Sequence, residues 1–593
     1  MKIMKKYILL FVSSMMLVSC LDTIILPDDK TVDEDFWKSK SDVALMVNAA
    51  YAGMSTENVI SRLIVWGDFR ADEYILSGES ENENDATAQA LSEMAVVSMQ
   101  VTNTFASWSD FYSVINKCNV VLKKAEEMYK NGVDPNYAEG DYLADRSQML
   151  ALRSLCYFYL VRNFRDVPYV DEAYMTSSQD RQMVQQTPAY VLGKCIESLE
   201  EAAGNALQAS SYPYRGGNWR RVGWMTYDGI CALLADIYLW RASVTHSDAD
   251  YQLCSQYCDR VIASKKSQHV VGREEQVTEY PLAPQTSMYY DLFVEQNAEE
   301  SIFEIQCESN AAICKFLHKF KNDQSTAGYF KTTGIFKAAG SHPNMNLGSV
   351  VYSENDLRFY TDIFNTTGVD NFDVRKMISL NSKSTATAEN RAAGVRAFGG
   401  LDQNWIVYRL SDVMLMKAEA MVQMVDTVTA GLTGDALAEK QTTILQGLQD
   451  ASKLIAAVSQ RSCTNGDSLR WSAFPNSFKN KTRMEELVLQ ERLRELCFEG
   501  KRWYDLLRYN YRHVEGVNYD ALLADLGEGQ LPSNYETMLN LVIRGRGTQG
   551  AGIKAKMRNE AYLYLPIPNR DLILSPGLKQ NPAYGSSNEY ERK

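Results

Sequence analysis

The chain contains 593 residues, of which 45% are hydrophobic and 23% are charged. This composition is typical of a globular protein and excludes a fibrous or intrinsically disordered chain. The formal net charge of -13 argues against nucleic acid or anionic lipid headgroups as the main partner, because phosphate binding depends on clustered Lys and Arg.

A secretory signal is the first element that the sequence predicts. Three lysines precede an apolar stretch from Tyr7 to Val18, which is shorter than the roughly 20 residues that a transmembrane helix needs. Leu17-Val18-Ser19-Cys20 matches the bacterial lipobox, so residues 1–19 are predicted to be removed and Cys20 to be lipidated. Acyl chains on Cys20 would attach the protein permanently to a membrane. A plain signal peptide cut nearby and an uncleaved anchor are the alternatives.

Helical patterns then alternate with irregular sequence. Residues 36–54 predict a helix with Ser41 or Asp42 as its N-cap, and residues 62–110 predict a long exposed excursion that includes a polar tract. Residues 111–129 and 145–164 predict two further helices. The second is apolar on nearly all sides and is therefore expected to be buried, so its three arginines, Arg146, Arg153 and Arg162, need partners.

The middle of the chain predicts more helices and a large insertion. Residues 187–206 and 225–244 favour antiparallel helix pairs, which is similar to a tetratricopeptide array with uneven spacing. From about 270 to 400 the sequence is rich in Gly, Asn, Ser and Thr, with residues 301–306 as a predicted strand. Long insertions on a rigid scaffold are where binding usually occurs.

Two strong helices and an irregular tail are predicted at the C-terminal end. Residues 404–424 and 484–510 each predict one helix. The second carries charges of both signs opposite its apolar face, which predicts a salt-bridged surface formed by Glu491, Arg494, Glu495 and Arg502. Residues 562–584 contain four prolines, so they cannot form one helix and are expected to lie extended over the body.

Signatures of catalysis are few. The five histidines form no HExxH motif, and residues 545–550 spell GxGxxG without the following strand of a dinucleotide site, which indicates a turn. The best metal candidate combines Cys254 and Cys258 with Cys314 and His318, but these lie in apolar, helix-like stretches that favour core packing. The other cysteines are likewise interpreted as small core residues rather than disulfides. No carboxylate pair is singled out for glycoside hydrolysis.

Several segments, in order, resemble the SusD/RagB family of Bacteroidetes surface lipoproteins. They include DEDFWKSKSDVALMVNAAY, MLALRSLCYFYLVRNFRDVPYV, YRLSDVMLMKAEA, ERLRELCFEGKRWYDLLRY and LPIPNRDLILSPGLKQNPAY. The resemblance implies a mostly α fold, with tetratricopeptide-type helix pairs as scaffold, long irregular insertions and a few short strands. It divides the chain into a signal peptide (1–19), an N-terminal region (20–250) and a C-terminal region (251–593) with a ligand-binding insertion at about 270–400.

The resemblance also implies a function. It predicts a non-catalytic glycan-binding lipoprotein on the outer face of the outer membrane, which hands polysaccharide or oligosaccharide to a SusC-like TonB-dependent transporter. A RagB-like peptide-binding protein is the alternative, and a surface hydrolase is a remote one. No cofactor is implied. A structural calcium ion stays open because acidic oxygen ligands are too common in the chain to identify a site.

Ligand contacts in this family tend to come from two variable parts. By that resemblance, the first excursion would supply Trp66, Arg70, Asp72 and Trp108, and the mid-chain insertion would supply Tyr329, Phe330 and Asn344. The aromatic rings would stack on apolar sugar faces, while the polar side chains would form hydrogen bonds with sugar hydroxyls.

Overall fold

The computed structural model describes residues 36–76, 85–176, 183–212, 218–269, 279–307, 329–339, 347–348, 350–364, 372–378, 403–463 and 479–585. Cys20, Cys314, His318 and Asn344 therefore lie outside the described residues. Among the helices that are described, none combines the length and the apolar character that a bilayer crossing would require.

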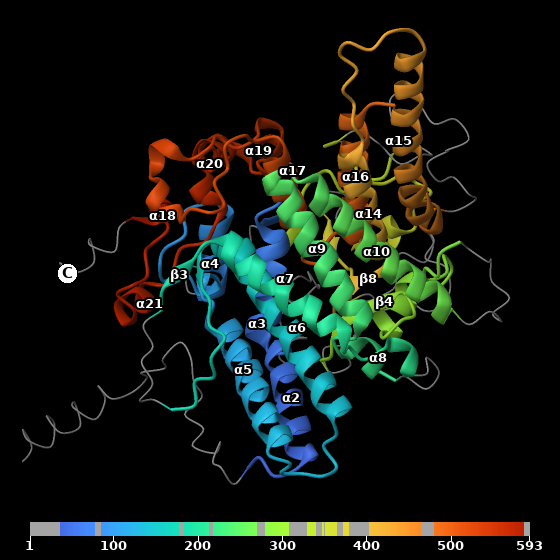
Figure 1. The fold of residues 1–593 in the computed structure, drawn as a ribbon. Coiled ribbons are helices and arrows are strands. Elements are labelled where there is room, and N and C mark those ends of the chain that lie inside the picture. Colours follow the sequence, from blue (N-terminus) through green and yellow to red (C-terminus); the bar gives the residue numbers. More distant parts are fainter. Residues whose placement is uncertain are drawn as a thin grey trace, which may run out of the picture.

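Helices dominate the fold (Figure 1). The longer ones are α2 (Lys40–Met54), α3 (Glu57–Ile64), α4 (Ala86–Ala95), α5 (Ser109–Lys130), α6 (Glu139–Phe164), α7 (Pro188–Gly204), α9 (Tyr227–Thr245), α10 (Asp248–Gln268), α14 (Leu410–Met424), α15 (Gly434–Ser462), α16 (Lys481–Leu496), α17 (Arg502–Arg512), α19 (Glu536–Val542), α20 (Gly550–Met557) and α21 (Asn569–Leu574). Short ones are α8 (Arg220–Gly223), α11 (Met288–Tyr290), α13 (Arg358–Asp362), α18 (Leu523–Leu526) and the π-helix η1 (Val65–Phe69).

Neighbouring helices in the sequence pack on one another. Contacts link α5 to α6, α6 to α7, α7 to α9, α9 to α10, α10 to α14, and α14 to both α15 and α16. This succession of packed helices confirms the mostly α fold class. In Figure 1, α15 projects beyond the rest of the body at the upper right.

The strands are few and short, and all of them form two-stranded antiparallel pairs within the described residues. They are β1 (Tyr74–Leu76) with β5 (Phe330–Thr332), β2 (Val167–Pro168) with β3 (Gln185–Gln186), β4 (Ser301–Ile305) with β8 (Trp405–Arg409), and β6 (Ile363–Phe364) with β7 (Asp373–Val374). Each pair joins distant parts of the sequence or closes a loop. They therefore connect the helical scaffold rather than form a sheet of their own.

Helix α6 behaves as its composition predicts. Every residue from 147 to 164 is buried. Arg146 pairs with Glu201 at 2.6 Å, and Arg153 donates to Asn119 at 2.8 Å. Arg162 lies 3.5 Å from Asp236 and over the ring of Tyr504. The predicted need for partners is thus met by neighbouring helices.

Some boundaries differ from the sequence-based expectation. Helix α2 begins one residue after Ser39, whose backbone N–H donates to the Asp42 carboxylate at 2.7 Å, so Ser39 is the N-cap rather than Ser41 or Asp42. The predicted helix over residues 404–424 begins only at Leu410, because Trp405–Arg409 form β8. That segment is β-branched and aromatic, which suits a strand once β4 supplies a partner.

The predicted helix over residues 484–510 is two helices, α16 and α17. The chain turns between them, with positive φ at Phe498 (64°) and Gly500 (74°). The carboxylate of Asp68 accepts hydrogen bonds from the backbone N–H groups of Gly500 (2.7 Å) and Lys501 (2.9 Å), across 432 and 433 residues. A distant acid therefore accepts from the buried backbone donors that the break leaves without helical partners.

The four charged residues predicted to form a salt-bridged surface are buried, which corrects that prediction. Glu491 and Glu495 both contact Arg358, at 2.9 and 2.8 Å. The other members of this buried ionic cluster are Glu300, Asp356, Asp362, Lys376, Arg409, Arg461, Arg494 and Glu499. Arg502 is also buried and pairs with Asp72. Periodicity showed that these residues share a face, but the segments that cover that face come from elsewhere in the chain.

The C-terminal segment lies over the N-terminal helices. Leu565 N–H donates to the carbonyl of Asn163, and the Gln580 side chain bonds both backbone groups of Ile567. Residues 562–584 form short helices and extended pieces, not one helix, as their prolines predict. The GxGxxG stretch follows α19 instead of a strand and leads into α20.

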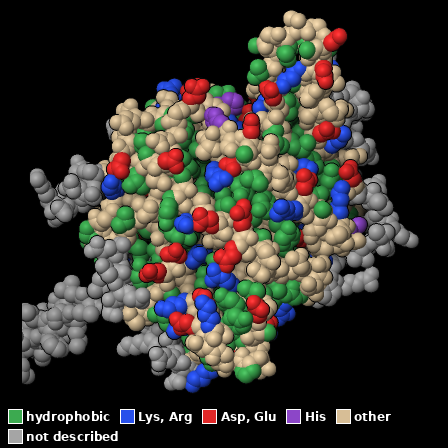
Figure 2. All heavy atoms as spheres, in the orientation of Figure 1, with side chains coloured by type: hydrophobic (Ala, Val, Ile, Leu, Met, Phe, Trp, Pro, Cys, Tyr) green, Lys and Arg blue, Asp and Glu red, His purple; other side chains and the backbone are tan. Residues whose placement is uncertain are grey.

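One hydrophobic core extends from Trp37 to Leu578 and includes residues from both the 20–250 and 251–593 regions. On the face drawn in Figure 2, acidic and basic side chains are interspersed without a large area of one sign. The scaffold is therefore one continuous helical body. Because this face has no large area of one charge, we expect a ligand to be bound by local groups of side chains.

Candidate functional site

The two tryptophans predicted as ligand contacts are core residues. Trp66 is 0% exposed and Trp108 is 1% exposed. The Trp66 indole donates to the carbonyl of Phe105 at 2.7 Å, and its ring stacks on Phe111 at a centroid distance of 5.0 Å. Trp108 packs edge-on against Tyr112. Neither ring presents a face to solvent.

Arg70 and Asp72 have internal partners as well. Arg70 donates to the carbonyl of Leu563 at 2.7 Å, and its guanidinium lies over the ring of Trp503. Burial lowers the pKa of Arg70 to about 10. Asp72 accepts two hydrogen bonds from Arg502, at 2.7 and 2.9 Å. These side chains join the N-terminal and C-terminal halves instead of facing a ligand.

The structure does bring the two predicted regions together, as the β1–β5 pair. Leu76 of β1 lies opposite Phe330 of β5. Phe330 is buried between Phe69 and Tyr74, with centroid distances of 4.9 and 5.3 Å. Tyr329 is half-buried, and its hydroxyl donates to the Asp85 carboxylate.

The structure therefore corrects the prediction of ligand contact for five residues, because their side chains are packed in the core. These residues are Trp66, Arg70, Asp72, Trp108 and Phe330. Tyr329 keeps a partly exposed side chain at the edge of the same region. Asn344 lies outside the described residues.

A different group of aromatic side chains remains partly exposed around α8. Tyr212, Trp219 and Trp224 form two edge-to-face contacts, with centroid distances of 5.9 and 5.5 Å. The exposed Arg220 places its guanidinium 5.0 Å from the Trp219 ring and 5.3 Å from the Trp224 ring. We name these four residues the ring cluster. The T-shaped geometry, with interplanar angles of 80° and 79°, leaves the ring faces pointing in different directions.

Carboxamide side chains lie beside the ring cluster. Gln306 donates to Asn297 at 2.9 Å, and Asn404 donates to Gln306 at 3.2 Å. A Cβ atom on Gly223 would lie 2.7 Å from Gln306 Cγ and 2.8 Å from Trp219 Cε3, so these two side chains occupy the space around that glycine. Gln306 and Trp219 are therefore adjacent, and Gln306 connects the ring cluster to Asn297 and the buried Asn404.

Backbone strain marks the same place. Gln296 and Asn297 adopt positive φ values of 61° and 50°, which residues with side chains rarely do. The side chain of Gln296 accepts a hydrogen bond from the backbone N–H of Asn404 at 2.6 Å. Such strain persists where the surrounding contacts over-determine a conformation, and it is often found at binding sites.

The ring cluster and its amides can bind a polar ligand that has apolar faces. Flat rings offer stacking area at a low entropic cost. Amide and guanidinium groups can form hydrogen bonds with hydroxyl groups and thereby orient the ligand. This combination is the one that the sequence analysis expected of a sugar site, but it is built from other residues. The stretch YPYRGGNW, between the helices predicted at 187–206 and 225–244, is the signal that could have indicated it.

The described cysteines lie in the core and do not gather with other metal-ligating side chains. The nine cysteines among them are unpaired and buried, as expected of small core residues. No group of three or more His, Cys, Asp and Glu side chains within the described ranges is arranged to hold a metal ion. Cys254 and Cys258 face the core from α10, and burial raises the pKa of the Cys254 thiol well above its usual value.

Comparison with known proteins covers nearly the whole chain. A model of the SusD family matches residues 331–584. SusD-like protein P38 of Formosa agariphila is 25% identical over 559 residues, which is 90% of this chain and 97% of that protein. SusD-like protein P2 of the same organism is 23% identical and covers 85% of this chain and 91% of its own length.

Solved structures share the fold. A SusD superfamily protein from Bacteroides thetaiotaomicron superposes with a TM-score of 0.58 and 19% identity, over 93% of this chain and 99% of that one. Surface glycan-binding protein A from Bacteroides uniformis gives a TM-score of 0.58 and 16% identity, over 92% of this chain and 100% of its own.

Proposed function

The chain belongs to the SusD/RagB family, and on that premise we propose that it captures glycans at the cell surface. The observation that carries the proposal is the ring cluster with its adjacent amides, which matches the chemistry of sugar recognition. One structural neighbour over 92% of the chain is a surface glycan-binding protein, which supports the same ligand class. The role is binding and delivery, without catalysis.

The proposal includes a place in the cell. The lipobox at residues 17–20 would attach the mature chain through Cys20 to the outer face of the outer membrane. Metabolic labelling with a fatty acid should be lost in Cys20→Ala, and labelling that persists in this variant would exclude Cys20 as the lipid site.

A membrane transporter is the proposed partner. A tethered protein that binds glycan without catalysis needs a route for its cargo, and a SusC-like TonB-dependent transporter would supply it. Detergent-solubilised membranes should therefore yield the protein together with a large barrel protein. Isolation as a lone monomer from several mild detergents would argue against this partnership.

The ligand class is tested by binding. The protein should be titrated with panels of polysaccharides, oligosaccharides and peptides. Saturable binding of one glycan class, without release of reducing ends, is the expected result. Binding of peptides alone would replace glycan capture with RagB-like peptide uptake. Turnover that disappears on mutation of one carboxylate would instead indicate a hydrolase.

A further inference from the structure

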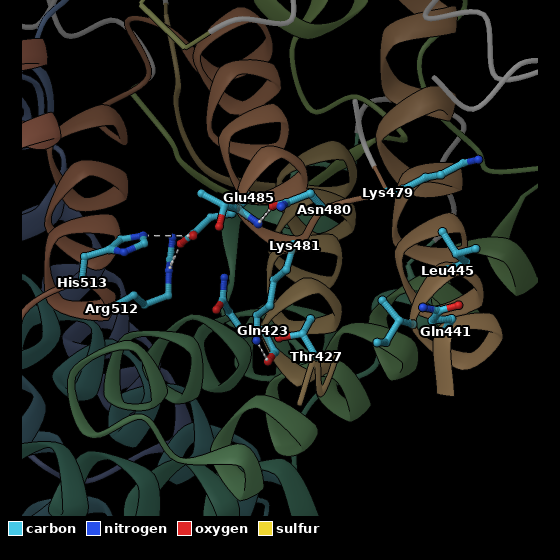
Figure 3. Close-up of a pocket in the computed structure, with 12 residues that line it drawn as sticks. Gln423, Thr427, Gln441, Leu445, Lys479, Asn480, Lys481, Glu485, Arg512 and His513 are labelled. Carbon is cyan, nitrogen blue, oxygen red and sulfur yellow. Dashed lines mark hydrogen bonds and ion pairs between the residues drawn. The ribbon is translucent and has the colours of Figure 1, made fainter. Parts of the chain in front are cut away.

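A pocket lies far from the ring cluster, where α14, α15, α16 and α17 meet (Figure 3). Its volume is about 670 Å³. It lies near the C-terminal end of α9, since Arg512 of the pocket contacts Ser243 of α9 at 3.1 Å. The ring cluster lies just before the start of α9. A helix of 19 residues spans about 28 Å, so the two sites are at opposite ends of α9.

The carboxylate in the pocket is already saturated. Glu485 is the one acidic residue among the described residues that line it. Glu485 accepts from Arg512 at 2.5 Å and from His513 at 3.1 Å (Figure 3). Burial alone would raise the pKa of Glu485, but Arg512 and His513 overcome that effect and lower it. Glu485 therefore remains charged and leaves little acceptor capacity for a ligand.

Hydrogen-bond donors in the pocket are in surplus. The ammonium group of Lys481 uses two of its three N–H bonds on the carbonyls of Gln423 (2.6 Å) and Val425 (3.2 Å). The side-chain nitrogen of Gln423 is buried and has no partner in the part of the chain that the structure describes. Lys479 is exposed and makes no ion pair with any described residue. These donors favour a ligand that has many hydrogen-bond acceptors.

The charge of the pocket favours an anion. Lys479 and Lys481 are two cations without a matching carboxylate on the lining, and both lie at the N-terminal end of the 16-residue helix α16. That end of a helix carries partial positive charge. The Asn480 side chain already caps the backbone N–H groups of Thr482 and Arg483, so the lysines rather than bare backbone provide the contacts.

The opposite wall is apolar. Ile444 and Leu445 of α15 are half-buried and line the pocket across from Arg512 and His513. In Figure 3, Leu445 and Lys479 lie on the α15 side, while Glu485, Arg512 and His513 lie on the α17 side. A ligand that combines a carbon-rich face with an anionic group would use both the aliphatic wall and the lysines.

We propose that this pocket is a second binding site, which takes a sugar unit carrying a carboxylate or sulfate group. The inference rests on glycan capture as the proposed function and extends it to acidic glycans. The ring of the sugar would pack on Ile444 and Leu445, while its anionic group would accept from Lys481, Lys479 and the free side-chain nitrogen of Gln423. A carboxylate and a sulfate ester present the same acceptor chemistry here. Separate titrations with a carboxylated and a sulfated oligosaccharide distinguish the two.

The test uses calorimetric titration of the full-length chain in detergent. The probes are a hexuronic acid oligosaccharide, a sulfated oligosaccharide, the neutral oligosaccharide of the same linkage, and inorganic sulfate. At least one acidic oligosaccharide should bind tenfold or more tightly than the neutral one, with an advantage that shrinks at high salt. Equal affinity for acidic and neutral sugars would overturn the inference. Inorganic sulfate that binds as tightly as the acidic sugar would overturn the sugar assignment.

Variants locate the effect. Lys479→Ala and Gln423→Met should each remove most of the acidic preference, and Lys481→Arg should retain it. Lys453→Ala removes an exposed lysine of α15 outside the pocket and serves as the matched control. An acidic preference that survives in both Lys479→Ala and Gln423→Met would contradict the site. If the unmutated chain bound neither neutral nor acidic glycans, the proposed function itself would be refuted.

Discussion

Two pairs of tryptophans in this protein occupy opposite environments. Trp66 and Trp108 lie within the region predicted to bind ligand, yet both are buried and packed on other rings. Trp219 and Trp224 follow a Gly-rich stretch that attracted no prediction, and both remain partly exposed. The comparison shows that residue type alone does not mark a sugar site. What matters is whether other segments cover the ring, because tryptophan stabilises a core as readily as it stacks on a ligand.

The largest expected effect is on the buried pair. Trp66→Ala should lower the free energy of unfolding by about 3–5 kcal/mol, because it opens a cavity and removes the hydrogen bond to Phe105. Urea denaturation measures this loss. If the variant kept its stability and lost glycan binding, Trp66 would be a ligand contact and the contrast between the pairs would fail.

Asp72→Asn tests the same region through charge. An amide has one oxygen in place of two, so Arg502 would lose one of its two charge-assisted hydrogen bonds and the neutralising charge. We expect the free energy of unfolding to fall by about 2 kcal/mol. Asp450→Asn, which alters an exposed pair with Lys453, should change it by less than about 0.5 kcal/mol. Equal effects in the two variants would contradict a structural role specific to Asp72.

The exposed pair should show the reverse pattern. Trp219→Ala should weaken glycan binding about tenfold, which corresponds to about 1.4 kcal/mol, with a small change in stability. Tyr190→Ala removes another exposed aromatic residue, 46% exposed on α7, and should leave binding unchanged. Titration with the glycan identified for the unmutated protein measures both. Unaffected binding in Trp219→Ala would remove the ring cluster from the site.

Counted per pH unit, the smallest expected effect is a pH dependence of stability from the buried region. Burial raises the pKa of Asp68 from 3.8 to about 7, although backbone N–H groups of residues 500–502 favour its charged form. A carboxyl group whose pKa is raised in the folded state contributes stability below about pH 4, and this contribution is lost as the pH rises through about 7. The slope should be about 1 kcal/mol per pH unit and should flatten in Asp68→Asn. Unfolding measured between pH 4 and pH 8 would contradict this if both proteins gave the same slope.

Much of the scaffold could be predicted. The burial of residues 147–164, the strand within 301–306 and the absence of one continuous helix in the described tail all followed from local composition and prolines. The break between α16 and α17 could not be predicted, because it depends on Asp68 from 432 residues earlier. The charged face of α16 was predicted to be exposed, but segments from distant parts of the sequence cover it. Periodicity groups the residues of one face but does not identify the segment that packs against it.

The sequence by itself indicated the helical class, the resemblance to the SusD/RagB family and the lipobox motif at residues 17–20, because these depend on composition and on short ordered motifs. Only the tertiary structure decided which side chains remain available to a ligand. Trp66 became core when helices α5 and α6 covered it, and Phe330 became core when β5 paired with β1. Trp219 and Trp224 stayed at the surface around the four-residue helix α8. Exposure is a property of contacts between distant segments, and those contacts form only when the whole chain folds.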